Sequence, residues 1–301
     1  MIFPSLLKSG DKIAIVSPAG KLQSNDLVGA TKILSSWGLQ VVLGDHVYDS
    51  DNYFAGKDEV RLKDIQQAFD DPSIMAVLCG RGGYGITRII EKIDLKSISV
   101  KPKWVIGFSD ITALHLKLVR HKIASIHGPL ATSFANGTEQ VTINSLQSLL
   151  FSGVSKLTAK QGSIRSGAVT APLTGGNLSL ILDSLGTADE IDTKNKILFI
   201  EEIGEKTYKI DRMFQQLLRA GKLENLAGLV IGHFSQIDNQ SSPFGDSWQE
   251  VITNIVDSYS YPLAFGFGFG HEPENSALVM GGLYKLKVNS EQSTIEWENM
   301  D

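Results

Sequence analysis

Cysteine is nearly absent from this 301-residue chain, in which Cys79 is the only one. A single thiol cannot form an intramolecular disulfide, and it cannot build a zinc site made of cysteines alone. The sequence also lacks the H-E-x-x-H zinc motif, an Asp-rich calcium loop and the G-x-x-x-x-G-K-[ST] phosphate-binding loop. These absences argue against a disulfide-stapled fold and a P-loop nucleotidase, and we expect neither a metal nor another cofactor.

Long hydrophobic runs and an excess of positive charge are missing as well. No stretch approaches the ~20 apolar residues that a membrane span requires. The apolar start of the chain is short, is broken by Pro4 and has no positive region before it, unlike a signal peptide. The net charge is −5, and lysines and arginines are scattered. We therefore expect a cytoplasmic protein that binds neither nucleic acid nor membrane.

The first half of the chain alternates short β-branched runs with helical periodicity. Such alternation predicts βαβ units and a parallel sheet, so the expected fold class is α/β with a Rossmann-like N-terminal domain. The predicted strands span residues 12–17, 39–44, 74–79 and 104–108, and the predicted helices lie near 24–37, near 58–69 and after 108.

The second half resumes this alternation only after a polar, glycine-containing interval at 135–170. We expect an N-terminal domain over 1–150, a linker region over 151–170 and a smaller C-terminal domain over 171–301. The elements expected in the C-terminal domain are a helix from about Asn177, strands at 196–202 and 226–234, helices at 208–221 and 246–257, and short strands from 263.

A glycine-rich segment follows the strand predicted at 74–79. Residues 80–85 match G-x-G-x-x-G, the dinucleotide-binding pattern. That pattern normally opens the first βαβ unit, whereas here it follows the third strand. Two other interpretations stay open: a cradle of backbone N–H groups for an oxyanion, and a simple tight turn.

The strand predicted at 104–108 ends in a segment similar to a nucleophile elbow. Gly107-Phe-Ser109-Asp110 follows the pattern G-x-S-x-G, except that Ile111 replaces the last glycine. Such a turn lifts the serine hydroxyl out of the sheet and places the next N–H at a helix N-terminus, which favours an anion. An ordinary helix N-cap at Ser109 or Asp110 is the alternative.

A nucleophilic serine needs a base, and a base needs an orienting carboxylate. Among six histidines, His271 ranks first because packing does not explain a histidine in a glycine-rich loop; His233 and His127 follow, at strand ends. His115 shares the apolar face of its helix and is expected in the core. Glu201 and Glu202 end a strand, where adjacent side chains face opposite sides, so only one of them can point into a given site.

These segments, taken in order, resemble the LD-carboxypeptidase family of serine peptidases, which also contains the microcin C immunity peptidases. The matching segments cover nearly the whole chain: Gly10–Ala19, Phe54–Arg61, Arg81–Gly85, Gly107–Thr112, His127–Pro129, Gly175–Leu178, Leu198–Ile203, Tyr208–Met213, Gly232–Phe234 and Gly270–Pro273.

The resemblance implies a Ser–Glu–His triad of Ser109, Glu201 and His271. It also implies an oxyanion hole formed by the N–H groups of Gly83 and Asp110. The implied architecture is a Rossmann-like domain and a β-rich C-terminal domain with the active site in the cleft between them. The implied reaction removes terminal D-alanine from murein tetrapeptide during cell-wall recycling, by a homodimeric enzyme without a cofactor.

Two further residues are candidate substrate-binding groups, namely Arg81 and Asn177. A carboxypeptidase must bind a terminal carboxylate, for which a bidentate guanidinium such as that of Arg81 is suited. Two alternative functions stay open: an immunity-type peptidase acting on peptidyl- or aminoacyl-nucleotide antibiotics, and a non-catalytic nucleotide-binding protein. The immunity branch uses aromatic stacking for the base, but Phe134 and Phe151 are the only aromatic residues in 130–174.

Overall fold

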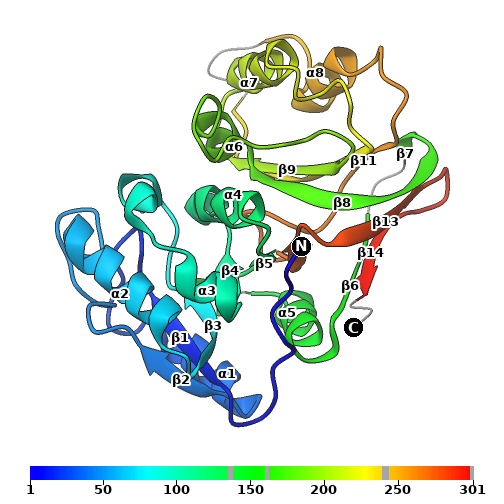
Figure 1. Cartoon of the computed structure of the whole chain (residues 1–301). Coiled ribbons are helices and arrows are strands. Elements are labelled where there is room, and N and C mark those ends of the chain that lie inside the picture. The colour runs from blue at the N-terminus through cyan, green and yellow to red at the C-terminus, as the bar shows by residue number, and fades with distance from the viewer. Residues whose placement is uncertain (135–137, 160–162, 239–243, 299–301) are drawn as a thin grey trace. The chain divides into compact units, whose positions relative to one another are not determined.

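A computed structural model describes residues 1–134, 138–159, 163–238 and 244–298 (Figure 1). The chain divides into two compact units. Unit 1 comprises residues 1–155 together with 273–281, and unit 2 comprises 156–272 together with 282–301. The chain therefore leaves unit 1, builds most of unit 2, returns to unit 1 for nine residues and ends in unit 2.

Unit 1 is built on a six-stranded sheet with the order β12-β5-β4-β3-β1-β2. The first five strands in the sequence pair in parallel, which confirms the predicted parallel α/β sheet. The last strand is added antiparallel to β5 by the returning segment. The strands are β1 (Lys12–Val16), β2 (Gln40–Leu43), β3 (Ile74–Cys79), β4 (Trp104–Gly107), β5 (Ser125–His127) and β12 (Leu278–Met280).

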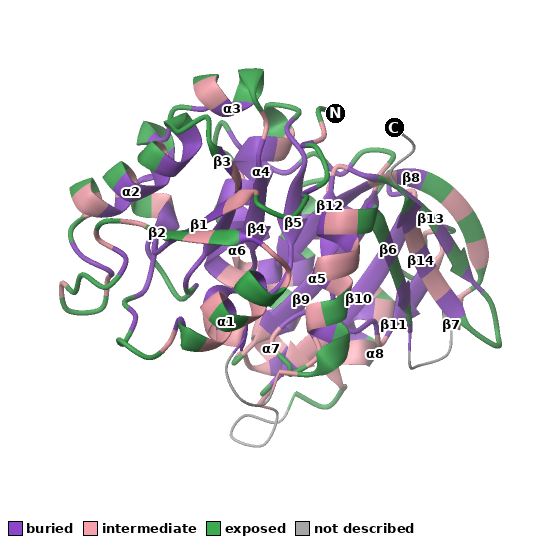
Figure 2. Cartoon of the chain, turned by 90° about the horizontal axis from the view of Figure 1, so that it is seen from below, coloured by how far each residue is buried: buried purple, intermediate pink, exposed green. Residues whose placement is uncertain are grey.

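The burial of these strands follows their place in the sheet. Every residue of β4 and β5 is buried, and β3 is buried except at Met75. Strand β2 lies at the edge and is mostly exposed (Figure 2). A parallel sheet is normally covered on both faces, which is why its central strands read as continuous apolar runs in the sequence.

Helices connect the strands of unit 1. Their bounds are α1 (Val28–Ser36), α2 (Asp58–Asp70), α3 (Lys96–Val100), α4 (Thr112–Arg120) and α5 (Gln140–Ser152), with short 3-10 turns η1 (Ile86–Arg88), η2 (Ile90–Lys92), η3 (Ser109–Ile111) and η4 (Ala131–Phe134).

Helix α5 corrects the expectation of an irregular interval at 135–170. It buries Thr142, Leu146, Leu149 and Leu150, a helical spacing that polar neighbours hide in the sequence. Gly153 ends the helix with φ +66°, a left-handed conformation that glycine adopts readily. Gly153 is therefore a helix stop rather than a sign of a linker.

The interval 151–170, expected as a linker, contains the end of α5, two strands of the second sheet and the start of a third. These strands are β6 (Val154–Thr158), β7 (Ser163–Arg165) and β8 (Gly167–Asn177), while residues 160–162 lie outside the described residues. Their short, polar, alternating pattern is typical of strands with one exposed face, which is harder to recognise than an apolar run. The domain limits themselves stay a prediction.

Unit 2 contains a mixed eight-stranded sheet with the order β6-β14-β13-β8-β9-β10-β11-β7. Strands β8 to β11 pair in parallel, while β7 pairs antiparallel with β11, and β13 pairs antiparallel with both β8 and β14. The remaining elements of this unit are β9 (Ile197–Ile203), β10 (Gly228–Ser235), β11 (Leu263–Phe265), β13 (Leu283–Val288), β14 (Ser293–Glu298), α6 (Leu178–Asp183), α7 (Thr207–Arg219) and α8 (Trp248–Ile255).

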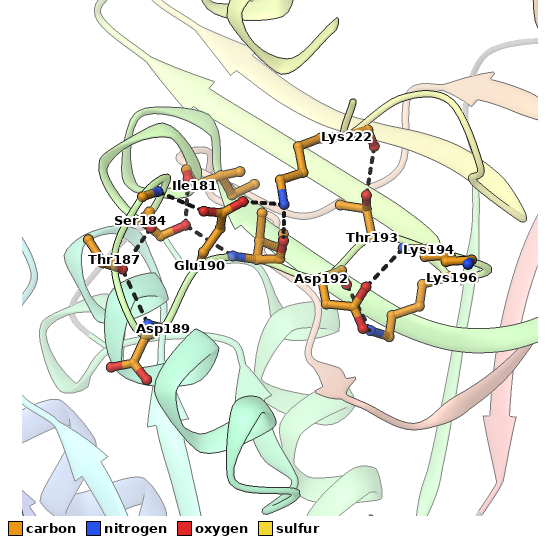
Figure 3. Close-up of polar contacts among 12 residues, drawn as sticks. Ile181, Ser184, Thr187, Asp189, Glu190, Asp192, Thr193, Lys194, Lys196 and Lys222 are labelled. Carbon is orange, nitrogen blue, oxygen red and sulfur yellow. Dashed lines mark hydrogen bonds and ion pairs between the residues drawn. The ribbon is translucent and has the colours of Figure 1, made fainter. Parts of the chain in front are cut away.

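The loop that joins α6 to β9 is tied down by Lys222 (Figure 3). Its ammonium group donates to the carbonyl of Ile191 at 2.9 Å and pairs with the Glu190 carboxylate. Thr193 donates in turn to the Lys222 carbonyl at 2.8 Å. Two charge-assisted bonds and one neutral bond therefore hold this connection, which leads into β9, against the turn after α7.

Among the described residues, no helix is both long and apolar enough to cross a membrane.

His115 lies in the core of unit 1, as its place on the apolar face of α4 predicts. Its side chain is fully buried between the carbonyl of Gly107 and the hydroxyl of Ser125, each 2.8 Å away. Because a carbonyl can only accept, Nε2 carries the proton and Nδ1 accepts from Ser125. Burial lowers the pKa of His115 to about 4, so the ring is neutral at pH 7.

Acid should therefore weaken folding through His115. The unfolded chain binds a proton at this residue near pH 6.5, whereas the folded chain does so only near pH 4, so stability rises with pH between these values. Relative to His115→Asn, the wild type should lose roughly 2 kcal/mol more between pH 7 and pH 5. Urea unfolding of both proteins at the two pH values measures this difference, and parallel losses would contradict the assignment.

Candidate active site

The strand order of unit 1 marks where a ligand is expected to bind. The parallel strands run 2-1-3-4-5, so the direction of winding reverses between β1 and β3. In open α/β sheets, ligands bind outside the carboxyl ends of the strands at such a switch point. The loops that leave β1 and β3 meet here: Gly80 donates to the carbonyl of Val16 at 2.7 Å, and Gly20 donates to that of Gly82 at 3.1 Å.

A buried arginine holds these two loops together. The Arg61 side chain, on α2, is 1% exposed and donates to the carbonyls of Pro18 and Gly85, the latter at 2.9 Å. It also pairs with Asp58, whose pKa is lowered mainly by a hydrogen bond from Arg88 and further by Arg61. Arg61 ends one of the sequence segments that resemble the family, but the sequence alone predicts no role for it. A signal was present, because a buried position on an amphipathic helix rarely holds an arginine without a partner.

The glycine-rich loop at 80–85 does not have the form of a dinucleotide site. It leads into the 3-10 turns η1 and η2 rather than into an α-helix whose N-terminus could bind a pyrophosphate. Gly83 has φ +95° and is exposed, whereas Gly82 is buried. The loop therefore presents backbone at Gly83, where a left-handed conformation favours glycine.

Ser109 lies at the strained turn between β4 and α4. Its φ of +62° is left-handed, which is uncommon for a residue other than glycine, and it is characteristic of nucleophile elbows. A Cβ on Gly82 would lie 3.2 Å from the Ser109 Cβ and 3.4 Å from its Oγ. The glycine loop therefore packs directly on the serine side chain.

Asp110 connects the serine turn to the glycine loop. Its carboxylate is buried and accepts a hydrogen bond from the N–H of Ile86 at 2.9 Å. The side chain of Asp110 thus fixes the distance between the two segments that contain the predicted oxyanion donors, Gly83 and Asp110 itself.

In unit 2, Glu201 and His271 form a buried pair. The Glu201 carboxylate on β9 is fully buried, and its Oε2 lies 2.7 Å from Nδ1 of His271. The His271 side chain is 16% exposed. With Nδ1 committed to the carboxylate, Nε2 is the ring nitrogen that can exchange a proton with another group.

Two glycines allow the loop that contains His271 to pack closely against β9 and β10. Gly270 has φ +119°, and a Cβ there would lie 2.9 Å from the Cβ of Glu201 and 3.0 Å from its Oε2. A Cβ on Gly232 would collide with the ring of Phe269. On the other side, Ser235 donates to the His271 carbonyl at 3.0 Å. The glycine-rich sequence around His271 is thus a packing requirement for the Glu201 contact.

The surroundings of His271 favour its charged form. Burial lowers the pKa of the imidazole, but the hydrogen bond to Glu201 and the charge of that carboxylate raise it more, with smaller contributions from Glu202 and Glu272. The pKa of His271 therefore lies above the ordinary value of 6.5.

Glu202 makes contacts that differ from those of its neighbour. Its carboxylate accepts hydrogen bonds from the N–H and hydroxyl of Ser179 at 2.8 and 2.7 Å and from the N–H of Ile203 at 2.8 Å. Asn177 also donates to it at 3.0 Å, while its own amide oxygen accepts from Leu180 as the N-cap of α6. The structure thus gives Asn177 a positioning task, and its contact with substrate stays a prediction.

The other candidate residues lie as follows. The Arg81 side chain is exposed and donates to the carbonyl of Lys21 at 3.1 Å, so the loop holds its guanidinium at the switch point. His127 is fully buried on β5, with its ring edge-on to Phe108. His233 lies on β10, and its backbone N–H donates to the carbonyl of Phe269.

Metal-binding groups and a reactive thiol are not found among the described residues. There, no cluster of three or more His, Cys, Asp or Glu side chains could hold a metal ion. Cys79 is fully buried, and burial raises the pKa of its thiol to about 12. This thiol is therefore unreactive at neutral pH.

The two aromatic residues of 130–174 pack inside unit 1. Phe134 and Phe151 both contact the Trp37 ring edge-on, with centroids 6.5 and 6.2 Å apart. They are thus engaged with a neighbouring helix rather than presented as a platform for a nucleobase.

The sequence matches known families over both units. Residues 13–128 match the LD-carboxypeptidase N-terminal domain, and residues 170–286 match the LD-carboxypeptidase C-terminal domain. The chain is 34% identical over 299 residues to the probable murein peptide carboxypeptidase of Bacillus subtilis, covering 97% of this chain and 94% of the relative. The chain belongs to the LD-carboxypeptidase family. It is a serine-type peptidase, which confirms the predicted enzyme class.

Further relatives agree with this assignment. The murein tetrapeptide carboxypeptidase of Pseudomonas aeruginosa is 30% identical, with 92% of this chain and 94% of the relative covered. The crystal structure of muramoyltetrapeptide carboxypeptidase from Oxalobacter formigenes has a TM-score of 0.89 at 28% identity, covering 96% of this chain and 99% of that one. The microcin C7 self-immunity protein MccF has the same fold, with a TM-score of 0.89 at 20% identity.

Replacing Gly270 by alanine should break the Glu201–His271 pair. The added Cβ would meet the Glu201 side chain, which must then move away from Nδ1. We expect peptidase activity to fall at least 100-fold, since an unoriented base is a poor one. The measurement is kcat/KM together with the NMR shifts of the His271 imidazole.

Gly204→Ala is the matched control for this change. Gly204 also has a left-handed φ, +75°, but nothing lies within 4 Å of its Cβ position. It should incur only backbone strain, on the order of 1 kcal/mol, and keep its activity. Equal activity of the two variants would remove the packing argument.

Proposed function

We propose that the protein cleaves the L,D-peptide bond that releases terminal D-alanine from murein tetrapeptide. The relatives from B. subtilis and P. aeruginosa, named for murein peptides, support this substrate class. The observation that carries the mechanism is the buried contact between Glu201 Oε2 and His271 Nδ1, because it prepares a base with a fixed tautomer.

In the proposed reaction, His271 Nε2 takes the proton of Ser109, and the serine Oγ attacks the carbonyl carbon of the scissile bond. Glu201 holds the ring in orientation and stabilises the imidazolium that forms. The protonated His271 then gives its proton to the leaving amine of D-alanine. Water, activated by the same ring, hydrolyses the acyl-enzyme and restores the serine.

The negative charge of the tetrahedral intermediate is assigned to the N–H groups of Gly83 and Asp110. The support is that the glycine loop packs on Ser109 and that Asp110 follows the serine at the start of η3. Arg81, held at the same loop by Lys21, is a candidate for binding the terminal carboxylate of the substrate. A homodimer and a cytoplasmic role in cell-wall recycling remain predictions from the family resemblance.

Incubation with murein tetrapeptide should yield tripeptide and free D-alanine, which mass spectrometry detects. Ser109→Ala should reduce this turnover by a factor on the order of 10⁴–10⁶, since it removes the nucleophile. Its thermal unfolding should stay close to that of the wild type, because alanine adopts the same backbone at similar cost. Residual activity above one tenth would remove Ser109 from the mechanism.

The pH dependence of kcat/KM should follow the ionisation of the His271 ring. The base must be neutral to accept the serine proton, so kcat/KM should rise with pH through the raised pKa of His271, above 6.5. Glu201→Gln removes the charge that raises this pKa, so the acid limb should shift to lower pH while the maximal rate falls. Glu291→Gln, an exposed carboxylate in the same unit, should leave the profile unchanged. An acid limb that does not move in Glu201→Gln would contradict the assigned pair.

A further inference from the structure

Tyr53 occupies a position at the switch point that the proposed mechanism does not use. It lies in the connection between β2 and α2, next to the loop that leaves β1. Its carbonyl accepts from the N–H of Lys21 at 3.2 Å, and Ala55 donates to the carbonyl of Ala19 at 3.0 Å. Backbone hydrogen bonds on both sides of Tyr53 therefore fix this segment against the β1 loop.

The ring of Tyr53 is held although half of the residue is exposed. Its exposed fraction is 51%, yet the ring packs edge-on against Phe54 with centroids 5.5 Å apart. Phe54 itself is fixed by two cations, with the guanidinium carbons of Arg61 and Arg88 5.0 and 5.2 Å from its ring centroid. An exposed tyrosine on so firm a support is prearranged for a contact with a ligand.

The hydroxyl of Tyr53 lies against the glycine loop. A Cβ on Gly83 would collide with this oxygen, so the phenol fills the space that a side chain at residue 83 would take. The neighbouring Gly82 packs on Ser109. The hydroxyl of Tyr53 and the side chain of Ser109 thus pack on neighbouring glycines of one loop.

Two exposed cations on the loops that Tyr53 contacts favour an anion at the switch point. Arg81, in the same loop, and Lys21, whose N–H binds the Tyr53 carbonyl, are both exposed cations. One guanidinium nitrogen of Arg81 donates a hydrogen bond to the carbonyl of Lys21. The Tyr53 hydroxyl therefore lies on a glycine loop that also carries Arg81, and it is a suitable donor for a carboxylate oxygen, because hydrogen bonds to ionised acceptors are the stronger kind.

We propose that Tyr53 is a substrate-binding residue whose hydroxyl donates a hydrogen bond to the C-terminal carboxylate of the peptide substrate. The assignment rests on the proposed function, since it takes Ser109 and Gly83 as the reacting centre. It adds a contact that selects a free carboxyl terminus, the feature that separates a carboxypeptidase from an endopeptidase.

The test measures binding rather than turnover. Calorimetry gives the Kd of murein tetrapeptide, and of the same peptide with a C-terminal amide, for Ser109→Ala and for Ser109→Ala/Tyr53→Phe. Loss of a hydrogen bond to a charged acceptor weakens binding about 10-fold or more. We expect this loss for the carboxylate peptide and a clearly smaller one for the amide, whose neutral carbonyl accepts a weaker hydrogen bond. Thermal unfolding verifies that the variants are folded.

Tyr48→Phe on the same background is the control, since Tyr48 is another exposed tyrosine of unit 1. It should change neither Kd. Equal weakening of both peptides by Tyr53→Phe would mean that the hydroxyl only shapes the glycine loop, and unchanged binding of both would leave it without a role; either result overturns the proposal. If Ser109→Ala with Tyr53 intact binds neither peptide, the murein substrate of the proposed function is wrong, and this assignment fails with it.

Discussion

The buried guanidinium of Arg61 is the interaction on which the site loops of unit 1 depend. A charge with 1% exposure is tolerated only when it is paired and hydrogen-bonded, and Arg61 meets this condition with Asp58 and two backbone carbonyls. Those carbonyls belong to the loops after β1 and β3. One side chain thus joins the two loops at the switch point, and Gly82 in the second of these loops packs on Ser109.

The candidate site also requires that the backbone approach key side chains closely, which glycine makes possible. Each unit meets this requirement separately. In unit 1, Gly82 lies against the Ser109 side chain, and in unit 2, Gly270 lies against Glu201. A side chain at either position would push away the group that performs the proposed chemistry. The glycine-rich segments are therefore explained by sterics rather than by flexibility, and neither requires a bound phosphate.

The sequence predicts the apolar strands well because a strand buried on both faces appears as a continuous run, as at 74–79 and 104–108. It also predicts the pairing of Glu201 with His271, although only through the family resemblance. It does not predict α5, whose buried residues alternate with polar ones, or the return of residues 273–281 to the first sheet. Such a return depends on contacts distant in sequence, which local patterns do not encode. The partners of Arg61 are distant in sequence as well, so its place on the apolar face of α2 indicates that it has partners but not which ones they are.

Adjacent glutamates on β9 show how the fold assigns different tasks to the same side chain. Successive residues of a strand face opposite sides, so Glu201 reaches His271 while Glu202 reaches Ser179 and Asn177 at the start of α6. Both carboxylates are buried, at 0% and 2% exposure, and each needs partners to offset its desolvation. The partners of Glu202 lie at the N-terminus of α6, where negative charge is favoured. Glu202 thereby fixes this helix, which follows β8. Glu201 has an imidazole instead, which can change its own charge. Of the two, Glu201 is therefore the carboxylate that can orient the ring and stabilise the imidazolium of the proposed mechanism.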